Sequence, residues 1–165
     1  MNDYTTRPVQ VGDAEAIRSI YNIEVLESTV TFDMVERSLD DQISWITDHS
    51  GSYPAIVAVN TTGTVVGFAS LTAYRPRPAY ATTVENSVYV HREHRSKGIA
   101  VTLMQELLTA AAEHGFHSVI ARIVGDHDAS IQLHASCGFQ QIGREVEVGR
   151  KFGKWLDVVV MQKML

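Results

Sequence analysis

Residues 88–100 have the sequence Val88-Tyr89-Val90-His91-Arg92-Glu93-His94-Arg95-Ser96-Lys97-Gly98-Ile99-Ala100, in which an apolar strand passes through a basic turn into a helix. The first amides of a helix have no partner within it, and the helix dipole adds partial positive charge there. Gly98 lets a ligand come close to the backbone, and Arg95 and Lys97 add cationic side chains. The segment suits an anion such as a phosphate, but solvated basic residues at an ordinary helix start would have the same pattern.

Strands and helices alternate on both sides of this segment. Before it, short apolar and alternating runs predict strands at residues 4–9, 54–59, 65–72 and 82–91. Helical spacing predicts two helices there, one capped by Asp13 and one that starts at Ser38 or Asp40. After it we expect a helix over 96–114, a strand at 119–124, a short helix capped by Asp128, and strands at 140–148 and 155–162. This order predicts a mixed α/β fold, with helices packed on a mixed sheet.

The composition indicates one globular domain over residues 1–165. Apolar residues make up 45% of the chain and charged residues 20%, as in ordinary globular proteins. The net charge is −5 and no run of Lys and Arg reaches three residues, so we expect no nucleic-acid partner. No apolar run approaches the ~20 residues of a membrane span, and the first ten residues lack a signal-peptide core. Cys137 is the single cysteine, which favours the cytoplasm and excludes an internal disulfide.

Three blocks of the chain resemble the GNAT superfamily of N-acetyltransferases. The first block is 83–100, where Arg95-Ser96-Lys97-Gly98-Ile99-Ala100 is similar to the pyrophosphate motif R/Q-x-x-G-x-G/A and differs from a Walker loop. The others are 129–134 (ASIQLH) followed by Gly138-Phe139, and 149–158 (GRKFGKWLDV). Within the superfamily the likeness is to the phosphinothricin and methionine sulfoximine acetyltransferases.

The resemblance implies a GNAT fold with acetyl-CoA as co-substrate and no metal. In that fold a mixed, mostly antiparallel sheet of six to seven strands is flanked by about four helices, and its central strands splay apart around the pantetheine arm. The backbone of Val88, Tyr89 and Val90 is then expected to pair with pantetheine. The amides expected at the pyrophosphate belong to Arg95, Ser96, Lys97, Gly98, Ile99 and Ala100. His127 stands where the subgroup has an Asn that contacts the cofactor, which leaves this contact open.

Acetyl transfer to an amine needs a base, because a protonated amine is not a nucleophile. The resemblance implies Glu85 as this base, acting directly or through water, and a structural Glu at a strand start is the alternative. His134 stands where many members of the wider family have a Tyr that protonates the leaving thiolate. The general acid is therefore expected to be His134 or solvent.

The acceptor is expected to be a small amine with an acidic end. Arg binds carboxylates and phosphinates through two parallel hydrogen bonds. The resemblance implies that Arg75, with Arg77 nearby, holds this end, and two solvated loop arginines are the alternative. Phe32 is a candidate pocket wall or else a core aromatic. Asn86 and Ser87 are candidate hydrogen-bonding residues, although strand alternation sends one of them to the other face.

Partners and alternative functions follow from the same resemblance. None of the seven histidines has a spacing typical of metal ligands, so no metal is expected. The family is often dimeric, which implies a homodimer in which residues 149–155 take part. Three functions stay open: acetylation of a small amino-acid analogue, acetylation of a protein N-terminus or another amine, and acyl-CoA binding by a sensor without catalysis.

Overall fold

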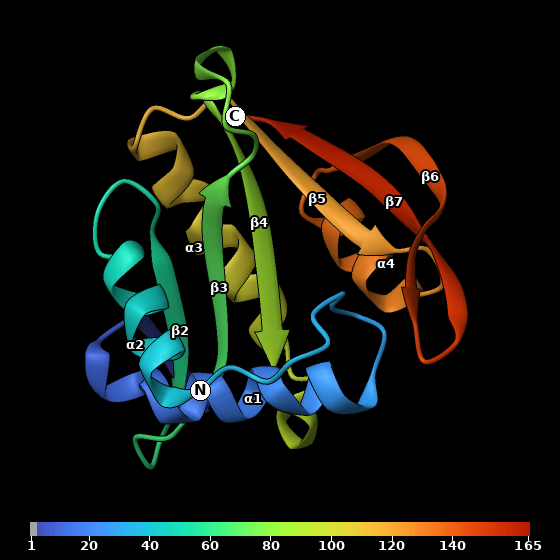
Figure 1. The fold of residues 1–165 in the computed structure, drawn as a ribbon. Coiled ribbons are helices and arrows are strands. Elements are labelled where there is room, and N and C mark those ends of the chain that lie inside the picture. Colours follow the sequence, from blue (N-terminus) through green and yellow to red (C-terminus); the bar gives the residue numbers. More distant parts are fainter. Residues whose placement is uncertain (1–2) are drawn as a thin grey trace.

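A seven-stranded sheet runs through the molecule, and the computed structural model describes residues 3–165. The strand order is β1-β2-β3-β4-β5-β7-β6 (Figure 1). The strands are β1 (Tyr4–Pro8), β2 (Ala55–Asn60), β3 (Val65–Ala73), β4 (Thr83–Val90), β5 (Ser118–Val124), β6 (Gln140–Lys151) and β7 (Lys154–Met164). Neighbouring strands are antiparallel except β4 and β5, which are parallel. The prediction of a mixed, mostly antiparallel sheet is confirmed, while residues 1 and 2 of the expected domain lie outside the described part.

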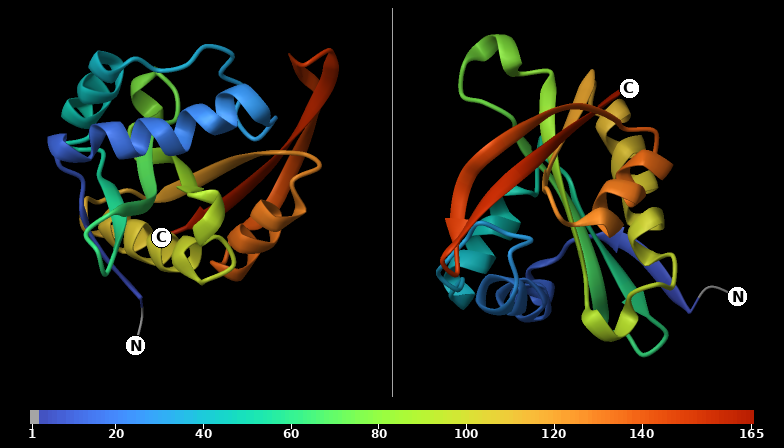
Figure 2. Two further views of the ribbon diagram at one scale, coloured as in Figure 1. Left: turned by 90° about the horizontal axis from the view of Figure 1, so that it is seen from below. Right: turned by 90° about the vertical axis from the view of Figure 1, so that its right-hand side faces the viewer.

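Helices cover both faces of this sheet (Figure 2). On one face lie α1 (Ala14–Glu27) and α2 (Leu39–Asp48), and on the other lie α3 (Ile99–Glu113) and α4 (Asp128–Ser136). The core of the first face includes Phe68, and that of the second includes Leu103. Short 3-10 helices precede α1, β4 and α3: η1 (Val11–Asp13), η2 (Pro78–Tyr80) and η3 (Arg92–His94). Within residues 3–165, no helix has the length and apolar character needed to cross a membrane.

Alternation along β4 sends neighbouring side chains to opposite faces of the sheet. Val84 and Val88 pack into the core beneath α3, whereas Tyr89 packs toward α1 and α2. Glu85 and Ser87 have the same parity as Tyr89, so they point to the α1 and α2 face. The predicted base therefore lies on the opposite side of the strand from the core that supports α3.

The strands β4 and β5 separate soon after they begin. They pair through three positions only, from Thr83 with Ser118 to Glu85 with Ile120. Beyond Glu85 both strands continue, but they diverge instead of pairing (Figure 1). The predicted splay of the central strands is confirmed, and it leaves one edge of β4 open.

Two helices begin differently from the prediction. The helix expected from about Ser96 starts at Ile99, because Ser96 (φ 61°) and Gly98 (φ 79°) both have left-handed backbone conformations that interrupt a helix. Asp128 is the first residue of α4 rather than its cap, and His127 occupies the N-cap position. Each of these two helices is therefore preceded by a short non-helical turn.

The predicted caps of α1 and α2 have different outcomes. The Ser38 hydroxyl accepts a hydrogen bond from the Asp41 amide at 3.1 Å, so this cap is confirmed. Asp13 precedes α1, but its side chain makes no capping bond to that helix. Its carboxylate instead accepts from the Gln10 amide and the Arg7 guanidinium, because a paired cation lies within reach.

Candidate active site

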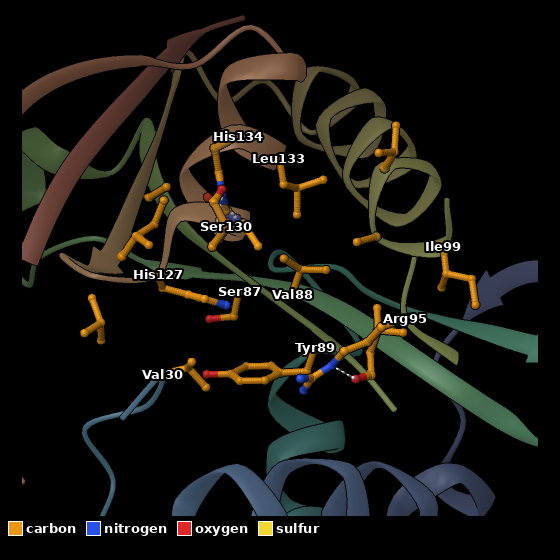
Figure 3. Close-up of a pocket in the computed structure, with 18 of the residues that line it drawn as sticks. Val30, Ser87, Val88, Tyr89, Arg95, Ile99, His127, Ser130, Leu133 and His134 are labelled. Carbon is orange, nitrogen blue, oxygen red and sulfur yellow. Dashed lines mark hydrogen bonds between the residues drawn. The ribbon is translucent and has the colours of Figure 1, made fainter. Parts of the chain in front are cut away.

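A cavity of about 430 Å³ lies where β4 and β5 separate. Its walls come from β4, β5, the turn between η3 and α3, and α4, and Val30 closes one side from the loop after α1 (Figure 3). Most of the residues predicted from the sequence line it: Asn86, Ser87, Val88, Tyr89, Val90, Arg95, Ser96, Gly98, Ile99, Ala100, His127 and His134. The predicted residues that do not line it are Phe32, Arg75, Arg77, Glu85 and Lys97.

Val88 and Val90 turn their backbone groups into this cavity. The amide of His91 donates to a carbonyl of β3 at 2.8 Å, and backbone groups alternate in direction along a strand. The N–H and C=O groups of Val88 and Val90 therefore face the gap, and the Val90 carbonyl accepts there from Arg95 Nε at 3.2 Å. By the same alternation the backbone of Tyr89 points to β3. The Val88 amide is thus a strand donor that the sequence alone did not locate.

The turn before α3 presents further amides to the cavity. The first hydrogen bond of the helix runs from Thr102 N to Gly98 O, so the amides of Ile99 and Ala100 have no carbonyl of the helix to bond. Lys97 was expected at the same anion site, but it lines a separate cavity of about 380 Å³ that also contacts β1. The left-handed turn at its neighbours accounts for this change of direction. The anion site is consequently made mainly of backbone groups.

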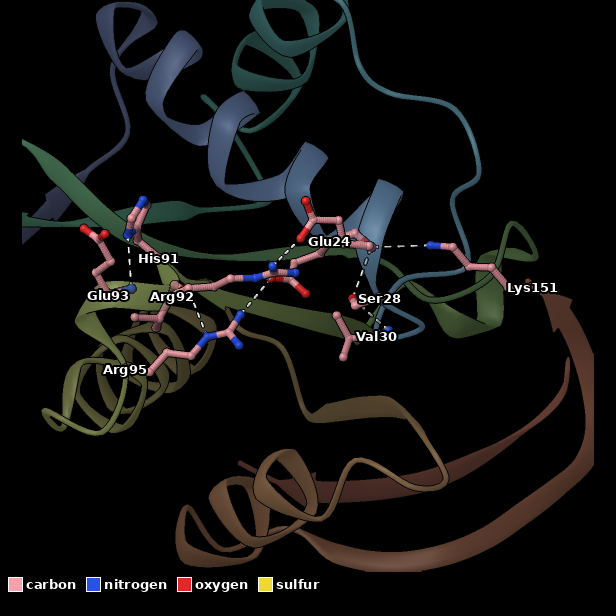
Figure 4. Close-up of polar contacts among 10 residues, drawn as sticks. Glu24, Ser28, Val30, His91, Arg92, Glu93, Arg95 and Lys151 are labelled. Atoms are coloured by element: carbon pink, nitrogen blue, oxygen red, sulfur yellow. Dashed lines mark hydrogen bonds and ion pairs between the residues drawn. The ribbon is translucent and has the colours of Figure 1, made fainter. Parts of the chain in front are cut away.

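Arg95 is held in place by a buried carboxylate (Figure 4). Its Nη2 donates to Glu24 Oε1 at 2.8 Å, and Arg92 Nε donates to the same oxygen at 3.0 Å. The Glu24 side chain is only 4% exposed. Burial alone would raise the pKa of Glu24, but hydrogen bonds from Arg92 and Ser28 and the charge of Arg95 outweigh it and lower the pKa. Glu24 therefore stays ionised and fixes α1 against the turn.

His127 faces the cavity from the start of α4 (Figure 3). Burial lowers the pKa of His127, and the positive charge of Arg95 lowers it further, against a smaller opposing contribution from Asp126. The ring is therefore neutral at neutral pH. It offers one donor and one acceptor at the position where the resemblance led us to expect a cofactor contact.

His134 is buried and both of its ring nitrogens are engaged. Nδ1 lies 2.7 Å from the Ser130 carbonyl, which can only accept, so Nδ1 carries the proton. Nε2 lies 3.0 Å from Asn86 Nδ2 and accepts from it. Burial lowers the pKa of His134, so the ring is neutral. Its single proton is committed to a backbone carbonyl, and this geometry favours solvent over His134 as the general acid.

The contact with His134 also settles the directions of Asn86 and Ser87. Asn86 points to the α3 and α4 side, where its Oδ1 is buried without a partner in the described residues. Ser87 lies on the other face, with Glu85, and lines the cavity. Only Ser87 of this pair is on the side of the candidate base.

Glu85 is half-buried, and its carboxylate oxygens are unbonded within the described residues. Burial raises the pKa of Glu85, and the negative charge of Glu145 adds to this rise, whereas Arg122 and Arg75 lower it in part. Within residues 3–165 no donor is hydrogen-bonded to its carboxylate, so its oxygens can accept from a substrate. A carboxylate with a raised pKa suits proton abstraction near neutral pH.

Three predicted acceptor residues lie away from the cavity. Arg75 is exposed, with its guanidinium 4.9 Å from the centroid of the Tyr74 ring. Arg77 is exposed just before η2. Phe32 is 40% exposed, and its ring rests against Gly149 so closely that a Cβ there would collide with it. Phe32 thus connects the loop after α1 with β6 rather than filling the core.

Arg122 is a cavity residue that sequence reasoning did not select. Its guanidinium makes two hydrogen bonds to the Glu145 carboxylate on β6, at 3.0 and 2.5 Å. The only signal in the sequence was a charged residue within the otherwise apolar 119–124 run. That signal does not distinguish a cavity residue from a surface residue.

The cavity fits an extended ligand that carries amides at one end and phosphates at the other. The open edge of β4 supplies a peptide-like donor and acceptor, and the start of α3 supplies anion-binding amides. These are the groups that acetyl-CoA needs from a protein. Among residues 3–165, no three His, Cys, Asp or Glu side chains lie close enough together to hold a metal ion.

Known proteins resemble this chain over nearly its whole length. The family model described as Acetyltransferase (GNAT) family matches residues 17–139. An L-methionine sulfoximine/L-methionine sulfone acetyltransferase of Pseudomonas aeruginosa is 38% identical, over 94% of this chain and 91% of the relative.

Two solved structures are similar in fold as well as in sequence. A phosphinothricin acetyltransferase of Sinorhizobium meliloti, in complex with acetyl-CoA, has a TM-score of 0.95 and 36% identity, over 99% of this chain and 89% of the other. A ribosomal-protein-alanine N-acetyltransferase of Brucella melitensis has the same TM-score of 0.95 and the same 36% identity, over 98% of this chain and 99% of the other. Overall similarity therefore does not choose between a small amino acid and a protein N-terminus as acceptor.

Proposed function

Because this chain belongs to the GNAT family of acetyltransferases, we propose that it transfers the acetyl group of acetyl-CoA to the α-amine of a small amino-acid analogue of the phosphinothricin, methionine sulfoximine or methionine sulfone type. One observation carries this proposal. The cavity runs from the backbone amides at the start of α3 to Ser87, which lies on the same face of β4 as the half-buried, unbonded carboxylate of Glu85.

The binding of acetyl-CoA is assigned to backbone groups. Val90 offers its N–H and C=O groups and Val88 its C=O group to the pantetheine arm, and the amides of Ile99 and Ala100 receive the pyrophosphate. Ser96 and Arg95 line the same end of the cavity. The bound co-substrate supplies the activated acetyl thioester.

The acceptor reacts on the Glu85 side of the strand. Glu85 removes a proton from the acceptor ammonium, directly or through a water, so that a neutral amine attacks the thioester carbonyl. The Val88 amide faces the gap and can donate to the carbonyl oxygen as negative charge develops there. Solvent protonates the departing thiolate, because the His134 proton is bonded to the Ser130 carbonyl.

A homodimer in the cytoplasm is part of the same proposal. The edge strand β6 and its hairpin with β7 expose large apolar side chains, among them Val146, Phe152 and Trp155. An exposed sheet edge of this kind is a ready site for a second copy. Analytical ultracentrifugation should show twice the 18.3 kDa of one chain. A monomer alone at working concentrations would exclude the dimer.

A thiol-release assay with acetyl-CoA and a panel of amines tests the proposed reaction. The panel holds phosphinothricin, methionine sulfoximine, methionine sulfone, common amino acids, polyamines and peptides with N-terminal Ala. We expect turnover on the first three and a large loss with Glu85→Gln. Turnover on the peptides alone would move the function to protein N-termini, as the Brucella structure allows. Binding of acetyl-CoA without any turnover would favour a sensor.

A further inference from the structure

We propose that Arg122 binds the α-carboxylate of the acceptor and thereby makes the enzyme selective for free amino acids over amines without a carboxylate. This inference rests on the proposed function and assigns the specificity of the same site. Arg122 lines the cavity and binds the carboxylate of Glu145. In the free enzyme the Glu145 carboxylate thus occupies the position that the substrate carboxylate would take.

The strand register puts Arg122 on the face of the candidate base. Glu85 pairs with Ile120 in the parallel β4–β5 ladder, so the two side chains share a face. Arg122 follows two residues later and points the same way. It lies two residues beyond the last pair between the two strands, where the cavity opens.

The Arg122–Glu145 pair is suited to exchange. The two side chains are 30% and 35% exposed, so neither charge is sealed from solvent or from a ligand. The guanidinium holds the carboxylate through two parallel hydrogen bonds, which is the arrangement it would make with a substrate carboxylate. Replacing one carboxylate by another preserves these bonds. Partly exposed ion pairs contribute little to stability, so their exchange is energetically mild.

The charges around this point complement a zwitterion. An α-amino acid carries its ammonium and carboxylate on the same carbon, so their binding groups must be neighbours. Glu85 and Arg122 are neighbours, because Glu85 pairs with Ile120 and Arg122 lies two residues further along the same face of β5. The charge of Arg122 accordingly lowers the pKa of the Glu85 carboxyl. Arg75 and Arg77 are less suited to this task, because neither lines the cavity.

The selectivity has a direct chemical consequence. In a peptide the α-carboxylate of the first residue is replaced by an amide, which carries no charge and offers a guanidinium only one acceptor. A peptide amine placed against Glu85 would leave Arg122 with Glu145 or with water. The enzyme should therefore prefer the free amino acid to the same residue at a peptide N-terminus.

The test compares methionine sulfone with its primary amide, in the native enzyme and in Arg122→Gln. In the native enzyme we expect kcat/KM to be higher for the acid. Arg122→Gln should lower kcat/KM for the acid about 10- to 100-fold, mainly through KM, as for a lost charge-assisted pair. The amide should change less than about threefold, and Arg122→Lys should restore part of the loss.

Two further variants separate binding from bracing of the sheet. Glu145→Gln removes the competing carboxylate and should lower KM for the acid. Arg144→Gln is the control, because it breaks a similar arginine–carboxylate pair, with Asp157. Arg144 lies opposite Val159 in the β6–β7 ladder and so is on the α3 side of the sheet, and it does not line the cavity. This variant should leave both KM values unchanged. Melting temperature and acetyl-CoA affinity check the folding of each variant.

Three results would overturn the inference alone, and a fourth would reject the proposed function as well. Equal losses on acid and amide in Arg122→Gln would make Arg122 a brace. Equal effects of Arg122→Gln and Glu145→Gln would mean that the pair acts as a unit in the fold. Equal kcat/KM values of the native enzyme for methionine sulfone and its amide would show that it does not select for a carboxylate, while the proposed acetyl transfer would still hold. Failure of the native enzyme to acetylate either compound would reject the proposed function itself, and this inference with it.

Discussion

The two ends of the cleft differ in what they offer a ligand: one end has backbone amides, and the other has charged side chains. The amides belong to β4 and to the start of α3, and one short segment, residues 88–100, supplies them. The charges belong to Glu85, Arg122 and Glu145, which come from three different strands. A backbone site depends on conformation and tolerates most side chains, whereas a side-chain site depends on which residues the strands bring together. The cofactor end should therefore respond to changes in backbone freedom, and the acceptor end to changes in charge.

Removal of the Glu85 carboxylate should have the largest effect. Glu85→Gln is expected to lower kcat about 10²- to 10⁴-fold, the usual contribution of a positioned base. Burial raises the pKa of Glu85 above its ordinary 4.5, so native kcat should fall with decreasing pH through a value above 4.5, and this limb should vanish in the variant. Steady-state kinetics over pH, with acetyl-CoA affinity as control, measures both. A loss of less than tenfold would make Glu85 structural.

The second test asks whether the turn before α3 depends on the ion pairs of Glu24 with Arg92 and Arg95. Glu24→Gln should lower the free energy of unfolding by about 1–3 kcal/mol, because a buried oxygen that accepts from Arg92 and Arg95 loses its charge. Glu27→Gln is the matched control: its side chain is 60% exposed and also pairs with Arg92, and it should cost less than about 1 kcal/mol. Urea unfolding measures both. Equal effects would mean that burial of Glu24 adds nothing.

The same carboxylate gives a pH dependence of stability. The pKa of Glu24 is lower in the folded chain than its ordinary 4.5. Its contribution is therefore complete above 4.5 and is lost as pH falls through the lower folded value. The difference in unfolding free energy between the native chain and Glu24→Gln should shrink over that acidic range. A difference that is constant with pH would contradict the ion-pair explanation.

A change of backbone freedom should act on the cofactor end alone. Gly98 has φ 79°, and Gly63, in the β2–β3 turn, has φ 85°. Substitution of either by Ala should cost about 1–2 kcal/mol of stability, because left-handed backbone strains a side chain. Only Gly98→Ala should also weaken acetyl-CoA binding, and a loss of about 1.4 kcal/mol in binding free energy would raise the Kd about tenfold. Calorimetric titration measures this, and equal acetyl-CoA affinities of the two variants would remove the turn from the binding site.

The smallest effect is expected at His134. His134→Gln should lower kcat by less than about tenfold, below the 10²- to 10⁴-fold contribution of a positioned general acid. The reason is that its proton is bonded to the Ser130 carbonyl. Rate profiles at alkaline pH provide the measurement. A loss of 10²-fold or more, together with disappearance of the alkaline limb, would restore His134 as the acid.

Several features could be predicted from the chain alone because they depend on neighbours in sequence. Apolar spacing located the strands and helices to within a few residues. Ser38 was one of two candidate starts of α2, and the structure selects it through the Asp41 amide three residues later. The turn before α3 and the unpaired amides of the first helical residues were also predictable, since Gly98 and a following helix suffice to make them. The resemblance added the splay of β4 and β5.

Tertiary structure decided where side chains meet. The parallel register of β4 and β5 puts Arg122 on the same face of the sheet as Glu85. The registers of β5 with β7 and of β7 with β6 bring Glu145 near Arg122, across the intervening strand β7. Lys97 lines a separate cavity instead of the predicted anion site, because the left-handed conformations of Ser96 and Gly98 direct the chain differently there. His134 is buried, and its Nδ1 proton is hydrogen-bonded to the Ser130 carbonyl one helical turn earlier, so it is not available to a leaving group. Local sequence determined backbone conformation because its interactions are short in range, whereas registers and burial depend on strands and helices far apart in the chain.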